Sequence, residues 1–299
     1  MNQVNVTIPA SVPNGCWISL AAVASGVLSN IATIPINASG GPCVDPVNGL
    51  SGIQVTPAGS QALRTATLAL TQPDRQGTSG ARVISTNASG AFESYTGIYA
   101  PANPLSPGGC LSGTLTPSTL SSFTGLDPGA ITLTGTGGVA LTLANQLGIK
   151  GAFSSTLTAG AIPSAGGTFT FAGAGGADVG AFSSVITFSN PILSWTNQGV
   201  AATVDRTQPL TVTWTGGNAG SYVYVTGTST AGSVTAGFTC LANAADGTFT
   251  VPAYILSALP AGTGAVEAQN DIYVKLPASG LDIGIASGVV SVSATATFK

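Results

Sequence analysis

The chain has 299 residues, of which 44% are hydrophobic and only 6% are charged, whereas about 25% of residues are charged in typical soluble proteins. Its seven basic residues are scattered and its formal net charge is −3, which excludes the clustered lysines and arginines that nucleic acids and anionic membrane surfaces require. The chain has no histidine, so zinc sites and catalytic triads built on histidine are excluded as well.

Residues 1–44 contain three strand-like segments. Val4, Val6 and Ile8 alternate with polar residues in "QVNVTIPA", a period of two that predicts a strand. Two more strands are predicted in "CWISLAAVA" and "SNIATIPIN". The uncharged stretch from Cys16 to Ile36, which includes almost all of both, has the length of a membrane-crossing helix, but its Ser, Gly, Asn, Thr and Pro residues favour strands and turns. We therefore expect no membrane span.

Residues 45–176 are expected to form a Gly/Thr-rich β-domain, because short β-branched runs alternate with glycine and proline. The predicted strands are "SGIQVTP", "ALRTATLALTQ", "ARVIST", "FESYTGIYA", "AITLTG", "ALTLANQL", "GAFSSTLTA" and "GTFTFAG". The segments "PDRQG", "NASG", "SPGG", "LDPG" and "AGG" are interpreted as turns between these strands.

Residues 177–299 show the clearest strand pattern and are expected to form an immunoglobulin-like β-sandwich. The predicted strands are "GAFSSVITF", "ILSWTN", "PLTVTWTGG", "SYVYVTGTS", "VTAGFTCLA", "GTFTVP", "NDIYVKLP" and "GVVSVSATATF". One short helix is predicted in "PAYILSALP" (252–260), which has a proline at each end. The whole chain is therefore predicted to be all-β, with tandem antiparallel sandwich modules of which the first is incomplete.

The first module is considered incomplete because of a resemblance. "QVNVTIPASVPNG" and "SNIATIPI" resemble the last strands of immunoglobulin-like domains of the IPT/TIG class, as these occur in bacterial surface proteins. A whole sandwich of this kind has about 100 residues, so residues 1–44 correspond only to its end. We favour the interpretation that the chain continues a longer exported protein. The alternatives are a rearranged, self-contained fold and completion by strands from another molecule.

A second resemblance covers most of the chain. The order "ADVGAF", "PLTVTWTGG", "AGFTC" and "GTFTVP" resembles the C-terminal region of large uncharacterised exported bacterial β-proteins. It implies an extracellular or cell-surface location, with the export signal upstream of Met1. It implies no catalytic or binding residue.

The four cysteines are Cys16, Cys43, Cys110 and Cys240, and none has the close spacing of a metal-binding pair. An even number of cysteines in such a chain favours two disulfides and an oxidising compartment. We favour Cys16–Cys43, with Cys110–Cys240 following by elimination, and four free thiols are the alternative.

Five aromatic residues are candidates for stacking on sugar rings: Trp195, Trp214, Tyr222, Tyr224 and Tyr254. Tyr222 and Tyr224 lie two residues apart on one strand face, so both are exposed if Val223 points into the core. Core packing is the alternative interpretation, above all for Trp214.

The acidic residues carry no catalytic or metal-binding motif. Asp74, Asp127 and Asp246 lie in glycine-containing turn segments, where an aspartate side chain commonly bonds the nearby backbone. No calcium loop, phosphate loop or dinucleotide motif is present. We therefore expect neither metal, cofactor nor enzymatic activity.

The preferred functional hypothesis is an exported, non-enzymatic structural, adhesion or interaction segment at the cell surface. Its partner would be a protein or a glycan. One alternative is a carbohydrate-binding accessory region of a secreted enzyme. Another is a fibre subunit, a homo-oligomer that assembles by strand addition at the incomplete N-terminal module.

Overall fold

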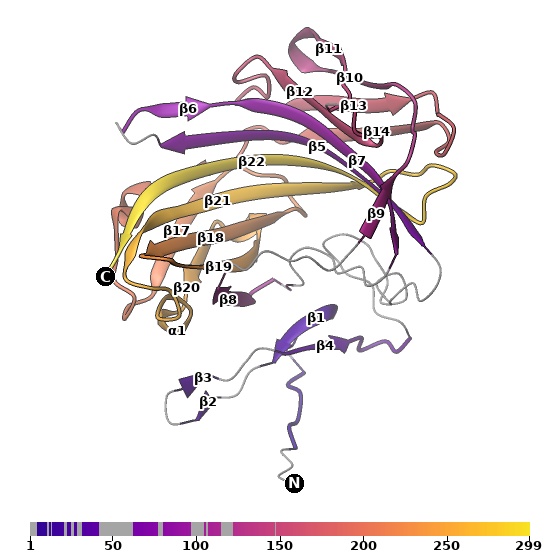
Figure 1. Ribbon diagram of the computed structural model, residues 1–299. Helices are drawn as coiled ribbons and strands as arrows, with labels where there is room; N and C mark the ends of the chain where they lie inside the picture. The colour runs from indigo at the N-terminus through magenta and orange to yellow at the C-terminus, as the bar shows by residue number, and fades with distance from the viewer. Residues whose placement is uncertain are drawn as a thin grey trace.

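The computed structural model describes residues 5–10, 12, 14–20, 23–24, 27–28, 32–41, 62–76, 80–96, 105, 107–114, 122–146 and 148–299. Strands dominate this part of the chain, and the only α-helix in it is α1 (Ala253–Leu256) (Figure 1). The prediction of an all-β protein is therefore confirmed. The helix predicted at 252–260 is also present, although it is shorter, with Pro252 at its N-cap.

The N-terminal strands form two small ladders. β1 (Gly15–Leu20) pairs antiparallel with β4 (Ala32–Ile36), and β2 (Val23–Ala24) pairs with β3 (Val27–Leu28). β1 and β2 correspond to the predicted segment "CWISLAAVA" and β4 to "SNIATIPIN", whereas β3 lies between the two. The first predicted strand is absent between residues 5 and 10, where Val6 and Ile8 are exposed. Alternation alone does not make a strand, because strand formation depends on packing against cross-strand neighbours.

An eleven-stranded sheet forms the larger layer of the molecule. Its main path runs through β12 (Ala152–Leu157), β7 (Thr86–Thr96), β5 (Leu63–Gln76), β22 (Ile283–Phe298), β21 (Gly262–Lys275), β18 (Tyr222–Ala231), β19 (Val234–Asn243) and β8 (Cys110–Thr114). Beside this path, β6 (Arg82–Ile84), β9 (Ser122–Gly125) and β16 (Thr203–Val204) pair with β5, β7 and β22. Figure 1 shows β5, β22 and β21 as long neighbouring arcs across the molecule.

Two smaller sheets form the second layer. One has the order β11 (Val139–Thr142), β10 (Ile131–Gly135), β13 (Gly167–Gly173) and β14 (Phe182–Phe188), and the other has the order β15 (Ser194–Trp195), β17 (Leu210–Thr215) and β20 (Thr248–Val251). Short 3-10 helices connect strands in both layers: η1 (Thr136–Gly138), η2 (Gln198–Ala202) and η3 (Ala244–Asp246).

Both small sheets cover the same face of the large sheet. On β22, Val290 packs in the core under the four-stranded sheet, and Ala294 packs in the core under the three-stranded sheet. These residues are an even number of positions apart, so their side chains leave the strand on one side. The other side is polar, because Thr226, Glu267 and Ser293 lie next to one another across β18, β21 and β22. The large sheet is thus covered by the two smaller sheets on one face, whereas the other face is polar around Glu267.

The boundary expected between residues 176 and 177 is not a boundary between sheets. β13 and β14 pair across it in full register from Gly167↔Phe188 to Gly173↔Phe182. β22 also pairs in parallel with β5, from Ile283↔Thr65 to Ser293↔Arg75. The segments 45–176 and 177–299 therefore share both layers, and the tandem arrangement of separate sandwiches is not what the structure shows. Hydrogen bonds between distant strands decide this, and they leave no local mark in the sequence.

Two turn predictions in this region are wrong. "PDRQ" is the end of β5 and "NASG" lies inside β7. Gly90 is needed within the strand because a Cβ at this position would meet the Leu68 side chain, 2.8 Å away. Glycine and proline were interpreted as turn signals, but here the glycine allows close packing inside β7 and the proline lies near the end of β5.

Gly264 supports the packing of β21 against β18, where it pairs with Ser229. A Cβ at Gly264 would overlap the backbone carbonyl of Thr228, which only a backbone shift relieves. We expect Gly264→Ala to lower the free energy of unfolding by about 2 kcal/mol, the usual cost of overpacking. Urea denaturation measures this. Gly113→Ala is the matched control, because a Cβ there has no atom within 4 Å, and equal losses in both variants would contradict the prediction.

Candidate functional site

A hairpin at the end of β5 forms one wall of the candidate site. β5 and β6 pair from Asp74↔Ile84 to Gln76↔Arg82. The Arg82 guanidinium donates from Nε to Asp74 Oδ1 at 2.9 Å and from Nη2 to the Asp74 carbonyl, also at 2.9 Å. Both side chains are about one third exposed. Asp74 was interpreted as a turn residue, and this is wrong, because it lies in a strand and holds the hairpin through Arg82.

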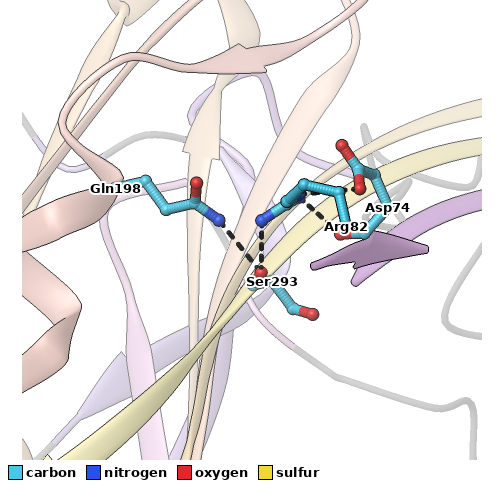
Figure 2. A network of polar contacts seen from close by, with 4 residues as sticks. All are labelled: Asp74, Arg82, Gln198 and Ser293. Carbon is cyan, nitrogen blue, oxygen red and sulfur yellow. Dashed lines mark hydrogen bonds and ion pairs between the residues drawn. The ribbon is translucent and has the colours of Figure 1, made fainter. Parts of the chain in front are cut away.

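The Ser293 carbonyl of β22 joins the hairpin to the opposite wall, as Figure 2 shows. It accepts one hydrogen bond from Arg82 Nη1 and one from Gln198 Nε2 of η2, each of 3.0 Å. The two donors come from segments more than 100 residues apart in the sequence. They fix the hairpin and η2 on either side of β22.

A cavity of about 560 Å³ lies beside this network. Its volume falls within the range of about 300–1,000 Å³ that is typical of small-ligand sites. The lining is formed by Gln76, Gln198, Gly199, Ala202, Thr230, Thr263, Gly264, Ala294, Thr295, Ala296 and Thr297. None of these residues is charged, so the cavity is polar through hydroxyl and amide groups.

The Arg82 contacts predict a local stability effect. We expect Arg82→Ala to lower the free energy of unfolding by about 1 kcal/mol. The partly exposed ion pair alone would contribute less than this, and the hydrogen bonds from Arg82 to two backbone carbonyls add to it. Amide hydrogen exchange is expected to accelerate at residues 82–84. Arg75→Ala is the control, because Arg75 lies on the same hairpin and its side chain makes no hydrogen bond within the described residues. Similar exchange in both variants would contradict this role of Arg82.

The five aromatic candidates do not form an exposed platform. Trp195, Trp214 and Tyr224 are buried, with 6%, 3% and 4% of their surface exposed. The two tryptophans pack in the core under the three-stranded sheet, and the Trp214 indole N–H donates to the Ala244 carbonyl at 2.8 Å. Core packing is therefore the correct interpretation for Trp214.

The two other aromatic candidates are separated. Val223 points into the core as expected, but the opposite face of β18 is also covered, because Tyr222 and Tyr224 pack with Leu105 and Leu241. Tyr222 is half-buried as a result. Tyr254 is 51% exposed and lies on α1. It belongs neither to the cluster of Tyr222 and Tyr224 nor to the lining of the cavity.

Cys110 and Cys240 form a disulfide, with their Cα atoms 4.0 Å apart. They are direct neighbours in the β8–β19 ladder, so the bond fastens the last strand of the large sheet. This pairing is confirmed. The pairing of Cys16 with Cys43 lies outside the described residues, because neither side chain is among them.

Two of the three predicted turn aspartates have the expected role. Asp127 accepts a hydrogen bond from the Gly129 N–H at 2.8 Å. Asp246 accepts one from the Asn243 N–H and completes a capping box at η3. Their carboxylates hold local backbone turns.

A buried carboxylate, Asp271, was not singled out from the sequence. It is 5% exposed and lies on the outer face of β21. Its oxygens accept hydrogen bonds from Gln269 Nε2 at 2.7 Å and from the Tyr273 hydroxyl at 2.9 Å. Burial raises the pKa of Asp271 to about 6, against the effect of these two donors. Because Gln269, Asp271 and Tyr273 are two residues apart, the sequence could have predicted that they share one face of β21. It could not have predicted that this face is buried.

Within β21, Asp271 has no second carboxylate at the spacing that sugar hydrolysis needs. Glu267 is the other acid on this face of β21, four residues away, which is about 13 Å along a strand. The two carboxylates of a glycosidase are about 5–10 Å apart. The described residues also contain no group of three or more Cys, Asp and Glu side chains placed to bind a metal ion.

A second polar network ties loops at the opposite end of β5. Arg64 donates to the carbonyls of Gly280 and Asp178, each at 2.5 Å, and Lys150 forms a 2.7 Å ion pair with Asp178. The Lys150 ammonium and the Asp127 N–H hold the pKa of the Asp178 carboxyl below its usual value. Its members come from β5 and from loops of this chain, so the network is structural.

Among the described residues, no helix is both long and apolar enough to cross a membrane. No known family model matches the chain, and no curated protein matches it significantly.

Proposed function

We propose that the chain is part of an exported, non-enzymatic protein and serves as a structural, adhesive or interaction segment outside the cell. The Cys110–Cys240 disulfide is the observation that carries this proposal. Disulfides of this kind persist in oxidising compartments and are rare where thiols are kept reduced.

The architecture supports a structural role. Among the described residues, twenty-four buried hydrophobic residues fill one core and twenty-one fill the other, both beneath one continuous sheet. Long strands with hydrogen bonds on both sides resist local opening. The low charge of the chain makes its contacts with a partner only weakly dependent on salt.

Fractionation of the producing cells tests the proposal. We expect the protein in the extracellular or cell-surface fraction, with a disulfide-linked peptide that contains Cys110 and Cys240 after alkylation of free thiols. Recovery in the cytoplasmic fraction with both thiols alkylated would overturn it.

Assembly into a fibre by strand addition at the N-terminal strands is a separate hypothesis. Light scattering coupled to size-exclusion chromatography tests it. A fibre subunit is expected to give masses that are multiples of 29.1 kDa and that increase with concentration, whereas a monodisperse monomer would exclude assembly.

A further inference from the structure

The cavity beside β22 lies where that edge of the strand has no neighbour. β21 pairs with one edge of β22 as far as Phe298. On the other edge, pairing with β5 ends at Ser293↔Arg75, and pairing with β16 begins at Thr297↔Thr203. Within the described part of the chain, no strand pairs with this edge at residues 294–296. These three residues line the cavity.

The lining has unused hydrogen-bonding capacity. The side chains of Gln76, Thr263, Thr295 and Thr297 make no hydrogen bond within the described residues, and Thr263 and Thr295 are exposed. Gln198 uses its Nε2 on the Ser293 carbonyl, which leaves its Oε1 as an acceptor. Hydroxyl and primary amide groups each donate and accept, so these side chains can bond a ligand of mixed polarity.

The chemistry of the lining selects the class of ligand. A charged ligand would be desolvated without a compensating charge, because no Asp, Glu, Lys or Arg lines the cavity. A purely apolar ligand would leave the threonine and glutamine groups without partners. Sugar hydroxyls donate and accept like the hydroxyl and amide groups of the lining, and Ala202 and Gly264 leave room for the C–H face of a ring.

An extended peptide is the competing occupant, since it could pair with the free edge of β22. Its pairing would be confined to residues 294–296, because β5 pairs with β22 up to Ser293 and β16 pairs from Thr297. The Ser293 carbonyl adjoins this short free edge. That oxygen already accepts from both Arg82 and Gln198, so these side chains occupy the place of a pairing strand. This favours the sugar over the peptide.

We infer that the cavity between the β5–β6 hairpin and η2 binds a neutral saccharide of one or two rings. Recognition is by hydroxyl and amide hydrogen bonds from Gln76, Gln198 and Thr295, without aromatic stacking. The inference concerns binding alone and holds whether or not the protein is exported.

Isothermal titration of the full chain against neutral gluco-, manno- and galacto-oligosaccharides tests this inference. We expect at least one of them to bind, and expect Thr295→Val and Gln76→Leu each to weaken that binding about tenfold, since each leaves a ligand hydroxyl unpaired. Thr67→Val is the matched control, because Thr67 is exposed on the same face of the large sheet and lies outside the cavity. Its affinity is expected to equal that of the unmodified chain.

Amide chemical shifts of the unmodified chain provide a second measurement that does not depend on the folding of a variant. Added sugar is expected to shift the resonances of residues 198–202 and 294–297. The inference is overturned if no neutral oligosaccharide binds at millimolar concentration, if only acidic oligosaccharides bind, or if the shifts map elsewhere. It is also overturned if a threonine-rich extended peptide binds at residues 294–296 and sugars do not.

Discussion

Replacing both Cys110 and Cys240 with alanine is expected to lower the free energy of unfolding by about 5 kcal/mol. The disulfide closes a loop across a sequence separation of 130 residues, and a cross-link of this span removes much of the entropy of the unfolded chain in the loop-closure model. Both sulfurs lie in well-packed surroundings, since Cys240 is fully buried and Cys110 is 8% exposed. Equilibrium denaturation in guanidinium chloride measures the effect.

The single variants separate the cross-link from the loss of packing. Either substitution alone abolishes the whole bond, so Cys110→Ala and Cys240→Ala are each expected to cost nearly as much as the double variant. If the two single losses were small and simply added up, the bond would contribute nothing and the stabilisation would come from packing alone.

Asp271→Asn is expected to change the free energy of unfolding in a pH-dependent way. The value for the variant minus that for the wild-type protein is expected to be about 3 kcal/mol more favourable at pH 7 than at pH 3. Burial raises the folded-state pKa of Asp271 from 3.8 to about 6, so the folded protein holds this proton more tightly than the unfolded chain. The wild-type stability that comes from this group is complete below pH 3.8, is lost as the pH rises towards 6, and stays lost above it. Asparagine is neutral throughout and avoids this loss.

Denaturation of the wild-type protein and of Asp271→Asn between pH 3 and pH 8 measures the difference between their free energies of unfolding. The titration of the other carboxylates affects both proteins equally and cancels in this difference. The groups that face Asp271 are Gln269, Tyr273 and Glu267 on its own strand and Tyr222 opposite on β18. Glu267→Gln removes the one like charge among them and is expected to move the transition to lower pH. A stability difference that does not change between pH 3 and pH 8 would show that Asp271 does not titrate as a buried group.

Most strands could be predicted from the sequence because strand formation here follows local patterns. The alternation in "SVSATATF" and in "FSSVITF" reappears in β22 and β14, with the larger apolar side chains inward. The disulfide of Cys110 and Cys240 was predicted by elimination, and the structure gives it a cause, since β8 and β19 place the two residues opposite each other.

Burial of the aromatic residues could not be predicted in the same way. Alternation assigns Tyr224 to the face opposite Val223, which is correct, but it does not say whether that face meets water. Leu105 and Leu241 cover it, and Leu105 comes from a loop more than 100 residues away. Asp271 lies near Tyr224 on this covered face, and its raised pKa has the same origin.

The sequence by itself determined the class of the protein, because low charge, glycine punctuation and a period of two are properties of neighbouring residues. Only the tertiary structure decided that β5 pairs with β22, that both segments share one sheet, and that a cavity lined by threonine and glutamine lies between η2 and the β5–β6 hairpin. These features arise from hydrogen bonds between residues up to 219 positions apart, as between Ser287 and Leu68. Such pairings depend on which strand edges meet in space, and no short stretch of sequence encodes that choice.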